Sequence, residues 1–338
     1  MKQALLQATG QIVIQQVDDL PVGPDDILIR VAYTGVCGSD LHSFRGTHPF
    51  RSAPVVLGHE VSGTIAALGA QVSGFALGDA VTVMPFVPCG PCRYCRQGRP
   101  NICENKVVPG SAWRGTFAEF FLSKPSATFR LPEHTDLRRA VLSEPLAVGV
   151  HSAARARLHA ESQALVLGGG TIGILTAAAA HLAGARSVAL TDLYEHNLAA
   201  ARNLGAAHTY SALTPNLVEA IRADYPEGFD AIFLTSGANV TIQQALALAQ
   251  RGARIIVSAF FVQEVTLSLL TVTIHELEFL GSQIYTAADF EQALAYLQDY
   301  PLPFEQIISH VLPLDRAQAA LEMMDRRTED SIKVLLVP

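Results

Sequence analysis

A glycine-rich turn between an apolar segment and an alanine-rich segment places the strongest constraint on the fold. Residues 164–185 read ALVLGGGTIGILTAAAAHLAGA, a pattern typical of a short buried strand, a tight turn and a helix. Missing side chains let the backbone approach a pyrophosphate, whose charge is stabilised at the helix N-terminus. The alternative is a turn that serves only packing. The candidate dinucleotide-binding residues are Gly168, Gly170, Thr171, Ile172 and Gly173.

An acidic residue follows at the distance expected for a ribose contact. Asp192 lies 19 residues beyond Gly173, at the end of the next apolar segment. A carboxylate there can accept both ribose hydroxyls of NAD and repels the 2′-phosphate of NADP. The next residues, LYEHN, contain no Arg or Lys that could bind that phosphate. The sequence therefore favours NAD, the alternative being a solvated acid at a strand end.

The apolar segments divide the 338 residues into two regions, as the length of the chain suggests. Residues 25–150 hold short apolar runs between Gly and Pro, which predict a β-rich domain. From about residue 155, apolar strands alternate with helices, which predicts a doubly wound parallel sheet. Two amphipathic helices follow, at 287–300 and 314–327, and residues 332–338 read as a closing strand. The predicted fold class is α/β.

Charge and hydropathy limit the partners of the chain. The formal net charge is -7, so repulsion from phosphate backbones disfavours nucleic acid. The first 20 residues lack the apolar core of a signal peptide, and no apolar run is long enough for a membrane span. We therefore expect a cytoplasmic protein without membrane partners, in which thiols stay reduced.

Four of the five cysteines lie in one short segment, CGPCRYCRQGRPNIC. In a reduced compartment such clusters are more often metal ligands than disulfides. Glycine and proline between the thiols favour tight turns, so one loop can surround a single ion. Four thiolates leave no open position, which predicts a structural zinc; an iron–sulfur loop or a zinc ribbon is the alternative. The predicted ligands are Cys89, Cys92, Cys95 and Cys103.

The fifth cysteine belongs to a second candidate constellation. Cys37, His59 and Glu60 offer soft, intermediate and hard ligands for a separate zinc. Ser39 and His42 follow Cys37 closely, and a hydroxyl followed by an imidazole can carry a proton to solvent. Taken alone these residues are weaker evidence, because a single cysteine is often a small buried hydrophobe.

The motifs together resemble the medium-chain zinc-dependent alcohol dehydrogenases over the whole chain. The order CGSDLH at 37–42, GHE at 58–60, the four-cysteine segment and the glycine turn is similar to that family. The chain departs from it at the second catalytic cysteine, because the later position reads Ser143-Glu144-Pro145-Leu146. This EPL variant resembles the polyol, threonine and sugar-acid dehydrogenase branch, including galactitol-phosphate and galactonate-type enzymes. There, the resemblance places Glu144 beside the catalytic zinc.

The resemblance also implies the domains and the reaction. It implies a GroES-like catalytic domain formed by residues 1–148 and 288–338, with an NAD-binding Rossmann domain at 149–287 inserted between. We expect two zincs per chain, NAD, and hydride transfer from a secondary hydroxyl of a polyol, sugar or sugar acid, in a homodimer or homotetramer. The alternatives are threonine oxidation on the same chemistry and, more remotely, a zinc-containing NAD sensor without catalysis.

Overall fold

The computed structural model describes residues 1–110, 113–261 and 263–338, and divides into two compact units. The first comprises Met1–Glu144 and Glu305–Pro338, and the second comprises Pro145–Phe304. Helix α10 (Ala287–Asp299) lies within the second compact unit, and the predicted domain boundary at residue 288 stays a prediction. No helix of the described ranges is long and apolar enough to span a bilayer.

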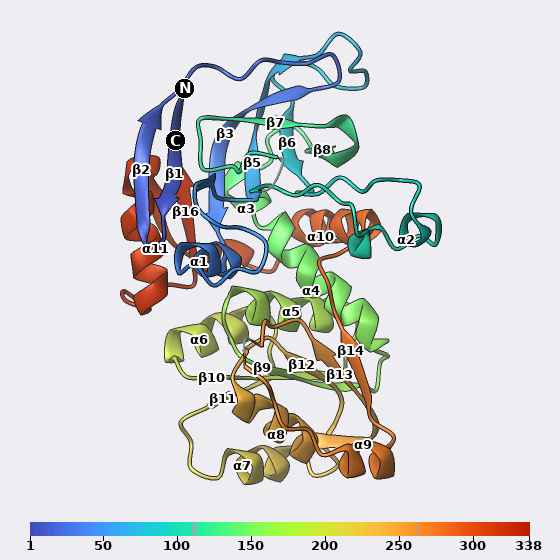
Figure 1. The fold of residues 1–338 in the computed structure, drawn as a ribbon. Helices are drawn as coiled ribbons and strands as arrows, with labels where there is room; N and C mark the ends of the chain where they lie inside the picture. The colour runs from blue at the N-terminus through green and yellow to red at the C-terminus, as the bar shows by residue number, and fades with distance from the viewer. Residues whose placement is uncertain (111–112, 262) are drawn as a thin grey trace. The chain divides into compact units, whose positions relative to one another are not determined.

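The first unit is built around a mixed sheet whose order is β15-β16-β3-β5-β6-β8, with β7 also paired to β3 (Figure 1). A smaller sheet has the order β2-β1-β4. The strands are β1 (Lys2–Ala8), β2 (Gln11–Gln16), β3 (Ile27–Val36), β4 (Val55–Val56), β5 (Glu60–Leu68), β6 (Ala80–Val83), β7 (Phe120–Ser123), β8 (Thr128–Arg130), β15 (Ile308–Pro313) and β16 (Lys333–Val337). The helices are α1 (Gly38–Phe44), α2 (Arg93–Arg96), α3 (Leu137–Ala140) and α11 (Ala317–Arg326).

Strand β16 lies inside this sheet although it comes last in the unit's sequence. It pairs in parallel with β15 and antiparallel with β3, where Leu335 lies opposite Gly35. Apolar side chains of β16 pack with those of β1 and α11 into one core, in which Leu6, Leu321 and Leu336 are fully buried. Residues 333–336 of β16 are all buried, so this strand is covered on both of its faces.

The second unit is a six-stranded parallel sheet of order β11-β10-β9-β12-β13-β14, flanked by helices (Figure 1). This is the strand order of the doubly wound dinucleotide-binding fold, which confirms the predicted fold class. The strands are β9 (Gln163–Leu167), β10 (Ser187–Asp192), β11 (His208–Ser211), β12 (Phe229–Leu234), β13 (Ala249–Val257) and β14 (Glu278–Gly281). The helices are α4 (Ser143–Ala156), which contains the boundary between the units, α5 (Thr171–Leu182), α6 (Glu195–Asn203), α7 (Leu217–Asp224), α8 (Asn239–Leu248), α9 (Leu269–His275) and α10.

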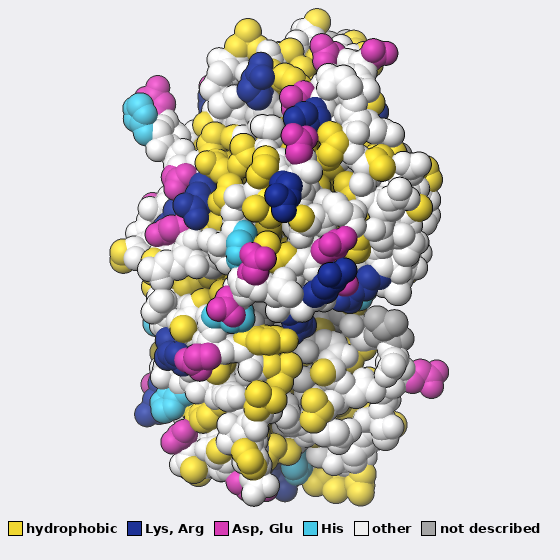
Figure 2. Space-filling model, turned by 90° about the vertical axis from the view of Figure 1, so that its left-hand side faces the viewer, with side chains coloured by type: hydrophobic (Ala, Val, Ile, Leu, Met, Phe, Trp, Pro, Cys, Tyr) yellow, Lys and Arg dark blue, Asp and Glu magenta, His cyan; other side chains and the backbone are white. Residues whose placement is uncertain are grey.

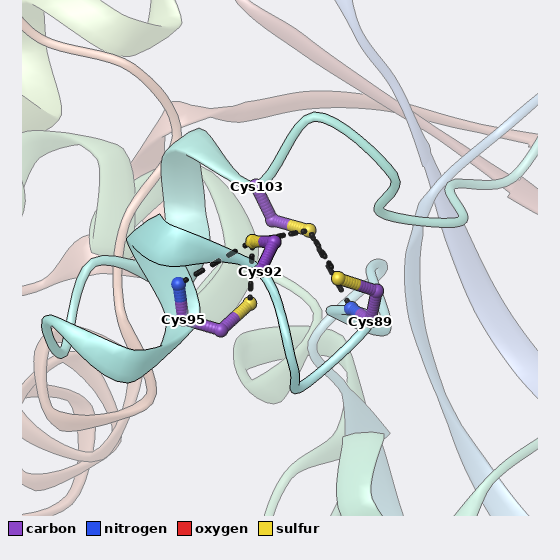
Figure 3. Close-up of side chains that lie close together, drawn as sticks. All are labelled: Cys89, Cys92, Cys95 and Cys103. Carbon is purple, nitrogen blue, oxygen red and sulfur yellow. Dashed lines mark hydrogen bonds between the residues drawn. The ribbon is translucent and has the colours of Figure 1, made fainter.

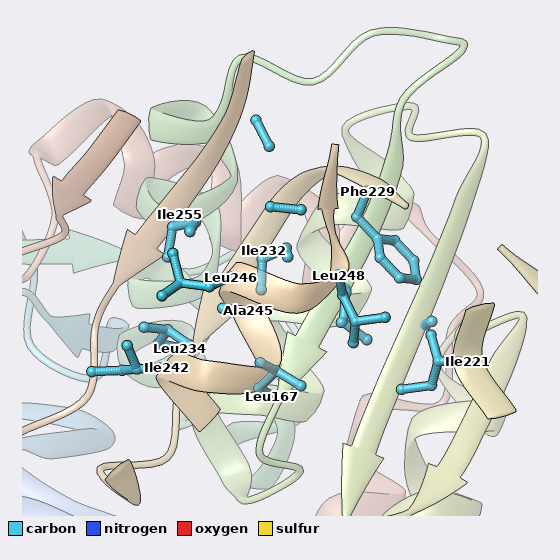
Figure 4. Packing of buried hydrophobic residues seen from close by; sticks show 14 of the residues in the cluster. Leu167, Ile221, Phe229, Ile232, Leu234, Ile242, Ala245, Leu246, Leu248 and Ile255 are labelled. Atoms are coloured by element: carbon cyan, nitrogen blue, oxygen red, sulfur yellow. The ribbon is translucent and has the colours of Figure 1, made fainter. Parts of the chain in front are cut away.

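One face of this sheet packs against α7 and α8 in a dense apolar cluster (Figure 4). Leu167, Ile232 and Ile255 from three neighbouring strands are fully buried there. On α5, the alanine-rich segment predicted from the sequence is buried throughout residues 177–180. Small side chains allow close packing of a helix, which is how the sheet holds its helices near the glycine turn.

Candidate active site

The four-cysteine segment folds into a single loop whose thiols converge (Figure 3). The Sγ–Sγ distances are 3.4 Å for Cys92–Cys95, 3.8 Å for Cys92–Cys103 and 3.5 Å for Cys89–Cys103. A disulfide needs about 2.05 Å, whereas four thiolates around one zinc lie about 3.8 Å apart. The four sulfurs lie within 4.8 Å of one another, and this donor set fits a closed zinc site.

Backbone amides inside the loop prepare the thiols for metal binding. The Cys95 amide donates to Cys92 Sγ over 3.5 Å and lowers the pKa of that thiol to about 6. The Cys89 amide donates to Cys103 Sγ over 3.5 Å and also lowers the pKa of Cys103. Because the thiolate is the ligating form, these two amides favour ligation by Cys92 and Cys103, whereas burial and the neighbouring thiols raise the pKa of Cys95 to about 12.

The second constellation also converges. Cys37 Sγ, a ring nitrogen of His59 and a carboxylate oxygen of Glu60 lie within 4.8 Å of one another. Cys37 is the N-cap of α1, and His59 and Glu60 lie where β5 begins. Gly58 has a φ of +88°, and a Cβ there would lie 2.3 Å from the Phe117 ring. Glycine at this position therefore lets the chain turn tightly enough to bring the histidine beside Cys37.

Asp40 connects the second constellation to the surrounding backbone. Its fully buried carboxylate accepts hydrogen bonds from the amides of Cys37, at 3.1 Å, and Gly58, at 3.3 Å. His59 Nδ1 lies 3.6 Å from Asp40 Oδ1, and this buried nitrogen has no hydrogen bond among the described residues. Burial alone would raise the pKa of Asp40, but His59 and Arg51 lower it well below its usual range. The carboxylate is thus placed to orient the imidazole.

Arg51 is a member of the site that the sequence analysis missed. Only 6% of its surface is exposed. Its Nη1 lies 3.3 Å from Asp40 Oδ1, and its Nη2 donates to Ser39 Oγ over 2.9 Å. His42, the other predicted member of the proton path, lies with Nδ1 3.1 Å from Thr47 Oγ1. Ser39 and His42 thus each have a defined partner, and proton transfer between them stays a prediction.

Lys333 is the second residue that the sequence analysis missed. Its Nζ donates to both carboxylate oxygens of Glu60, at 2.7 and 2.8 Å, and to the Val36 carbonyl at 3.0 Å. Both side chains are buried. The only signal in the sequence is a lysine inside the apolar closing strand, and its partner lies 273 residues away.

Glu144 is not among the ligand atoms that converge in the described structure. Among residues 1–110, 113–261 and 263–338, the groups of metal-ligating atoms within 4.8 Å of one another do not include it. It is nevertheless buried, with 6% of its surface exposed, in the first turn of α4. Direct coordination by Glu144 stays a prediction.

The glycine turn has the geometry that a pyrophosphate needs. Gly168 has a φ of +113°, and a Cβ on Gly173 would lie 1.7 Å from the Gly168 carbonyl oxygen. Gly170 is the N-cap of α5, and apart from its own chain neighbours no described residue has an atom within 4 Å of the place its Cβ would take. Thr171 and Ile172 begin the helix and are half-buried. At Gly173 the turn is tightly packed, where α5 meets β9. At Gly170 it leaves space in which a ligand could approach the backbone.

Asp192 is already a hydrogen-bond acceptor within the protein. Its Oδ2 accepts from the Gly169 amide at 2.7 Å, and its Oδ1 accepts from the Tyr194 amide and Asn197 Nδ2, both at 2.9 Å. A carboxylate offers about four acceptor positions, so about one remains, on Oδ2. One ribose hydroxyl can bind there, whereas a second would have to displace a present donor.

Comparison with known proteins identifies the class. Residues 23–133 match the alcohol dehydrogenase GroES-like domain, and residues 171–299 match the zinc-binding dehydrogenase domain. The chain is 30% identical to sorbitol dehydrogenase of Bacillus subtilis (strain 168) over 100% of this chain and 97% of that protein. It therefore belongs to the zinc-dependent alcohol dehydrogenase family, and it is an enzyme of that class.

Two further relatives bear on substrate and cofactor. A 2-dehydro-3-deoxy-L-galactonate 5-dehydrogenase of Pseudoalteromonas atlantica is 34% identical, over 89% of this chain and 88% of that protein. A zinc-binding dehydrogenase of Sinorhizobium meliloti 1021 has a TM-score of 0.94 and 31% identity, over 100% of this chain and 99% of that one. That structure is bound to NADP, so the cofactor preference within this class needs its own test.

Proposed function

We propose that this enzyme transfers a hydride from a secondary hydroxyl of a polyol, sugar or sugar acid to NAD. The convergence of Cys37, His59 and Glu60 carries the proposal. The names of the relatives, a sorbitol and a sugar-acid dehydrogenase, support this substrate class. Oxidation of threonine at its secondary hydroxyl is the alternative on the same chemistry. The need for reduced thiols supports a cytoplasmic location.

The chain holds two kinds of metal site in this proposal. Cys89, Cys92, Cys95 and Cys103 would hold a structural zinc. Cys37 and His59, with Glu60 or Glu144, would hold a catalytic zinc with one open position. When bound there, zinc supplies Lewis acidity, which favours loss of the alcohol proton near neutral pH.

The protein's own groups move that proton and bind the cofactor. Ser39 accepts the proton on Oγ as it releases its own hydroxyl proton, so the side chain stays neutral; the Arg51 guanidinium, which donates to the same oxygen over 2.9 Å, orients this hydroxyl. His42 then passes it towards solvent. The amides at the start of α5 bind the pyrophosphate, and Asp192 Oδ2 accepts a ribose hydroxyl.

We also propose a homo-oligomer. Strand β14 is an edge of its sheet, and helix α9 has no buried residue. Leu269, Leu270 and Ile274 on α9 are 68%, 69% and 53% exposed. Exposed edges and apolar helices are usually covered, so a second copy of the chain is the expected partner on this face.

The test combines a substrate panel with metal analysis. NAD reduction is measured across polyols, sugar phosphates, aldonates and threonine, alongside zinc per chain. Cys37→Ala should be inactive, folded and able to bind NAD, with one zinc fewer than the wild type. EDTA should abolish turnover while the four-thiolate zinc stays bound. Activity that persists without the second zinc would refute the proposed mechanism.

A further inference from the structure

A buried ammonium group lies within the candidate catalytic metal site. Lys333 is 1% exposed, and Glu60 is fully buried. The lysine has three N–H donors, and three acceptors lie within 3.0 Å: two oxygens of Glu60 and the Val36 carbonyl. The side chain is therefore held in one place by a complete set of hydrogen bonds, and Val36 directly precedes the candidate ligand Cys37.

Space for this arrangement is built into the facing strand. Gly35 on β3 lies opposite Glu60 on β5 and opposite Leu335 on β16. A Cβ on Gly35 would lie 1.7 Å from Glu60 Oε2. The glycine thus leaves room for the carboxylate at the place where Lys333 reaches it.

Lys333 lies beside the candidate ligands in the structure itself. Its Nζ donates to both oxygens of Glu60 and to the carbonyl of Val36, the residue before Cys37. Glu60 and Cys37 are groups whose negative charges would surround a zinc ion. Burying several anions without a cation is strongly unfavourable, because their mutual repulsion adds to the loss of hydration.

We propose that Lys333 is a built-in counter-ion for the catalytic site: it stabilises the anionic ligands while the metal is absent and weakens the binding of the metal. The inference rests on the proposed metal site. A positive group fixed beside the ligands compensates their charge in the metal-free enzyme. The same group repels a divalent cation that enters the site. Lys333 thus keeps the metal-free site in its folded arrangement but lowers the affinity for zinc.

A purely structural role for Lys333 predicts the opposite effect on the metal. If the lysine only anchored β16 to β3, its loss would loosen the site and weaken zinc binding. If it is a counter-ion, its loss should strengthen zinc binding while the metal-free protein becomes less stable. The sign of the change in zinc affinity therefore separates the two roles.

The experiment uses the full-length enzyme depleted of its exchangeable zinc by chelation. Lys333→Met removes the charge and keeps much of the side-chain volume, whereas Lys333→Arg keeps the charge. Lys124→Met is the matched control, because Lys124 forms a half-exposed ion pair with Asp26 in the same unit, at 2.6 Å. Zinc affinity is measured at pH 8 by competition with a chelator, and melting temperatures are measured with and without added zinc.

We expect Lys333→Met to bind the exchangeable zinc about tenfold more tightly or better. Its metal-free form should melt below the wild type, and zinc should raise its melting temperature by more. Lys124→Met and Lys333→Arg should stay near the wild type in zinc affinity. Weaker or unchanged zinc binding by Lys333→Met, or an unchanged melting temperature without metal, would overturn the inference.

Two controls keep these results separable. If the wild type and Cys37→Ala bind the same amount of zinc, the proposed metal site itself is wrong. If Lys333→Met does not fold, Lys333→Met/Glu60→Gln must fold, because it removes the uncompensated carboxylate together with the lysine. A double variant that also fails to fold would refute the counter-ion role.

Discussion

The hydrogen bonds of Asp192 show how a single carboxylate can serve both the fold and a ligand. Three of its acceptor positions bind the glycine turn and the start of α6, including Asn197. In the proposed function the remaining acceptor position would bind a ribose hydroxyl, which requires the glycine turn to keep its shape. We therefore expect the negative charge of Asp192 to determine the preference for NAD over NADP. The number of hydrogen bonds that its carboxylate accepts should matter less.

Asp192→Ala should raise the NADP to NAD ratio of kcat/KM by about tenfold or more, because repulsion of the 2′-phosphate is removed. Asn197→Ala is the control, since it removes one hydrogen bond and keeps the carboxylate. Its ratio should stay near that of the wild type. An equal ratio in the wild type and Asp192→Ala would exclude Asp192 from the ribose site.

Substitution of Cys95 tests the proposal that the four-cysteine loop holds a structural zinc. Cys95→Ser should lose one zinc equivalent and lower the melting temperature well below that of the wild type, because one ligand of a closed site is lost. Cys37→Ser is the matched cysteine variant and should lose the other zinc with a smaller change in melting temperature. Metal analysis and calorimetry decide the point, and full zinc content with an unchanged melting temperature in Cys95→Ser would contradict it.

The site residues that sequence reasoning found were those in short motifs. Cys37, His59 and the glycine turn lie in segments whose spacing has a chemical meaning. Arg51 and Lys333 carry no such signal, because their partners are set by how strands pair and loops return. The ion pair between Lys333 and Glu60 can be recognised only once the positions of β16 and β5 in the sheet are known.

At the scale of elements, the sequence predicted several strands and helices that have a clear apolar pattern. It did not predict several elements that bury few of their side chains. The strands at β9, β10, β12 and β13 and the helices α5, α6, α8 and α10 all follow the predicted pattern. Within the second unit, the sequence predicted no separate element for α4, β11, α7, α9 or β14. Strand β11 is half-exposed, and α9 buries none of its residues, so neither has the apolar pattern on which the prediction relied.

Helix α10 begins with a reciprocal cap that depends on pH. Thr286 Oγ1 accepts from the Asp289 amide at 3.3 Å, and Asp289 Oδ2 accepts from the Thr286 amide at 2.8 Å. His151 Nδ1 also lies 2.9 Å from Asp289 Oδ2. Burial alone would raise the pKa of Asp289, but His151 and Thr286 lower it below its usual value. A carboxyl with a lowered pKa in the folded state stabilises the fold above its unfolded pKa.

Asp289→Asn should therefore reduce the free energy of unfolding by about 1–2 kcal/mol at pH 7. The difference from the wild type should shrink as the pH falls below about 4, where the unfolded carboxyl takes up a proton. Asp299→Asn, at the exposed other end of α10, is the control and should have little effect. Denaturant unfolding across pH 3–7 measures this, and a difference that does not depend on pH would contradict it.

At the scale of the whole molecule, one face can be judged for charges that would direct association between copies. On the face drawn in Figure 2, basic and acidic side chains lie next to one another rather than in separate fields. The apolar face of α9 is therefore the stronger candidate for contact between copies.

Leu270→Glu combined with Ile274→Glu should convert the oligomer into smaller species, because charges would be buried in the contact. Leu213→Glu is the matched control, since Leu213 is 71% exposed elsewhere in the same unit. Size-exclusion chromatography with light scattering gives the mass of each variant. A double variant with the wild-type mass would place the contact on another face.

The position of β16 has a consequence for how the chain is made. This strand lies between β15 and β3, yet it is translated after the entire second unit. Residues 145–304 are contiguous and can fold as they leave the ribosome, whereas the first sheet must wait with an open edge beside β3. Lys333 arrives with that strand, so Glu60 has no counter-ion during most of synthesis. The edge of β3 would therefore stay open to pairing with other chains until β16 is added to the sheet.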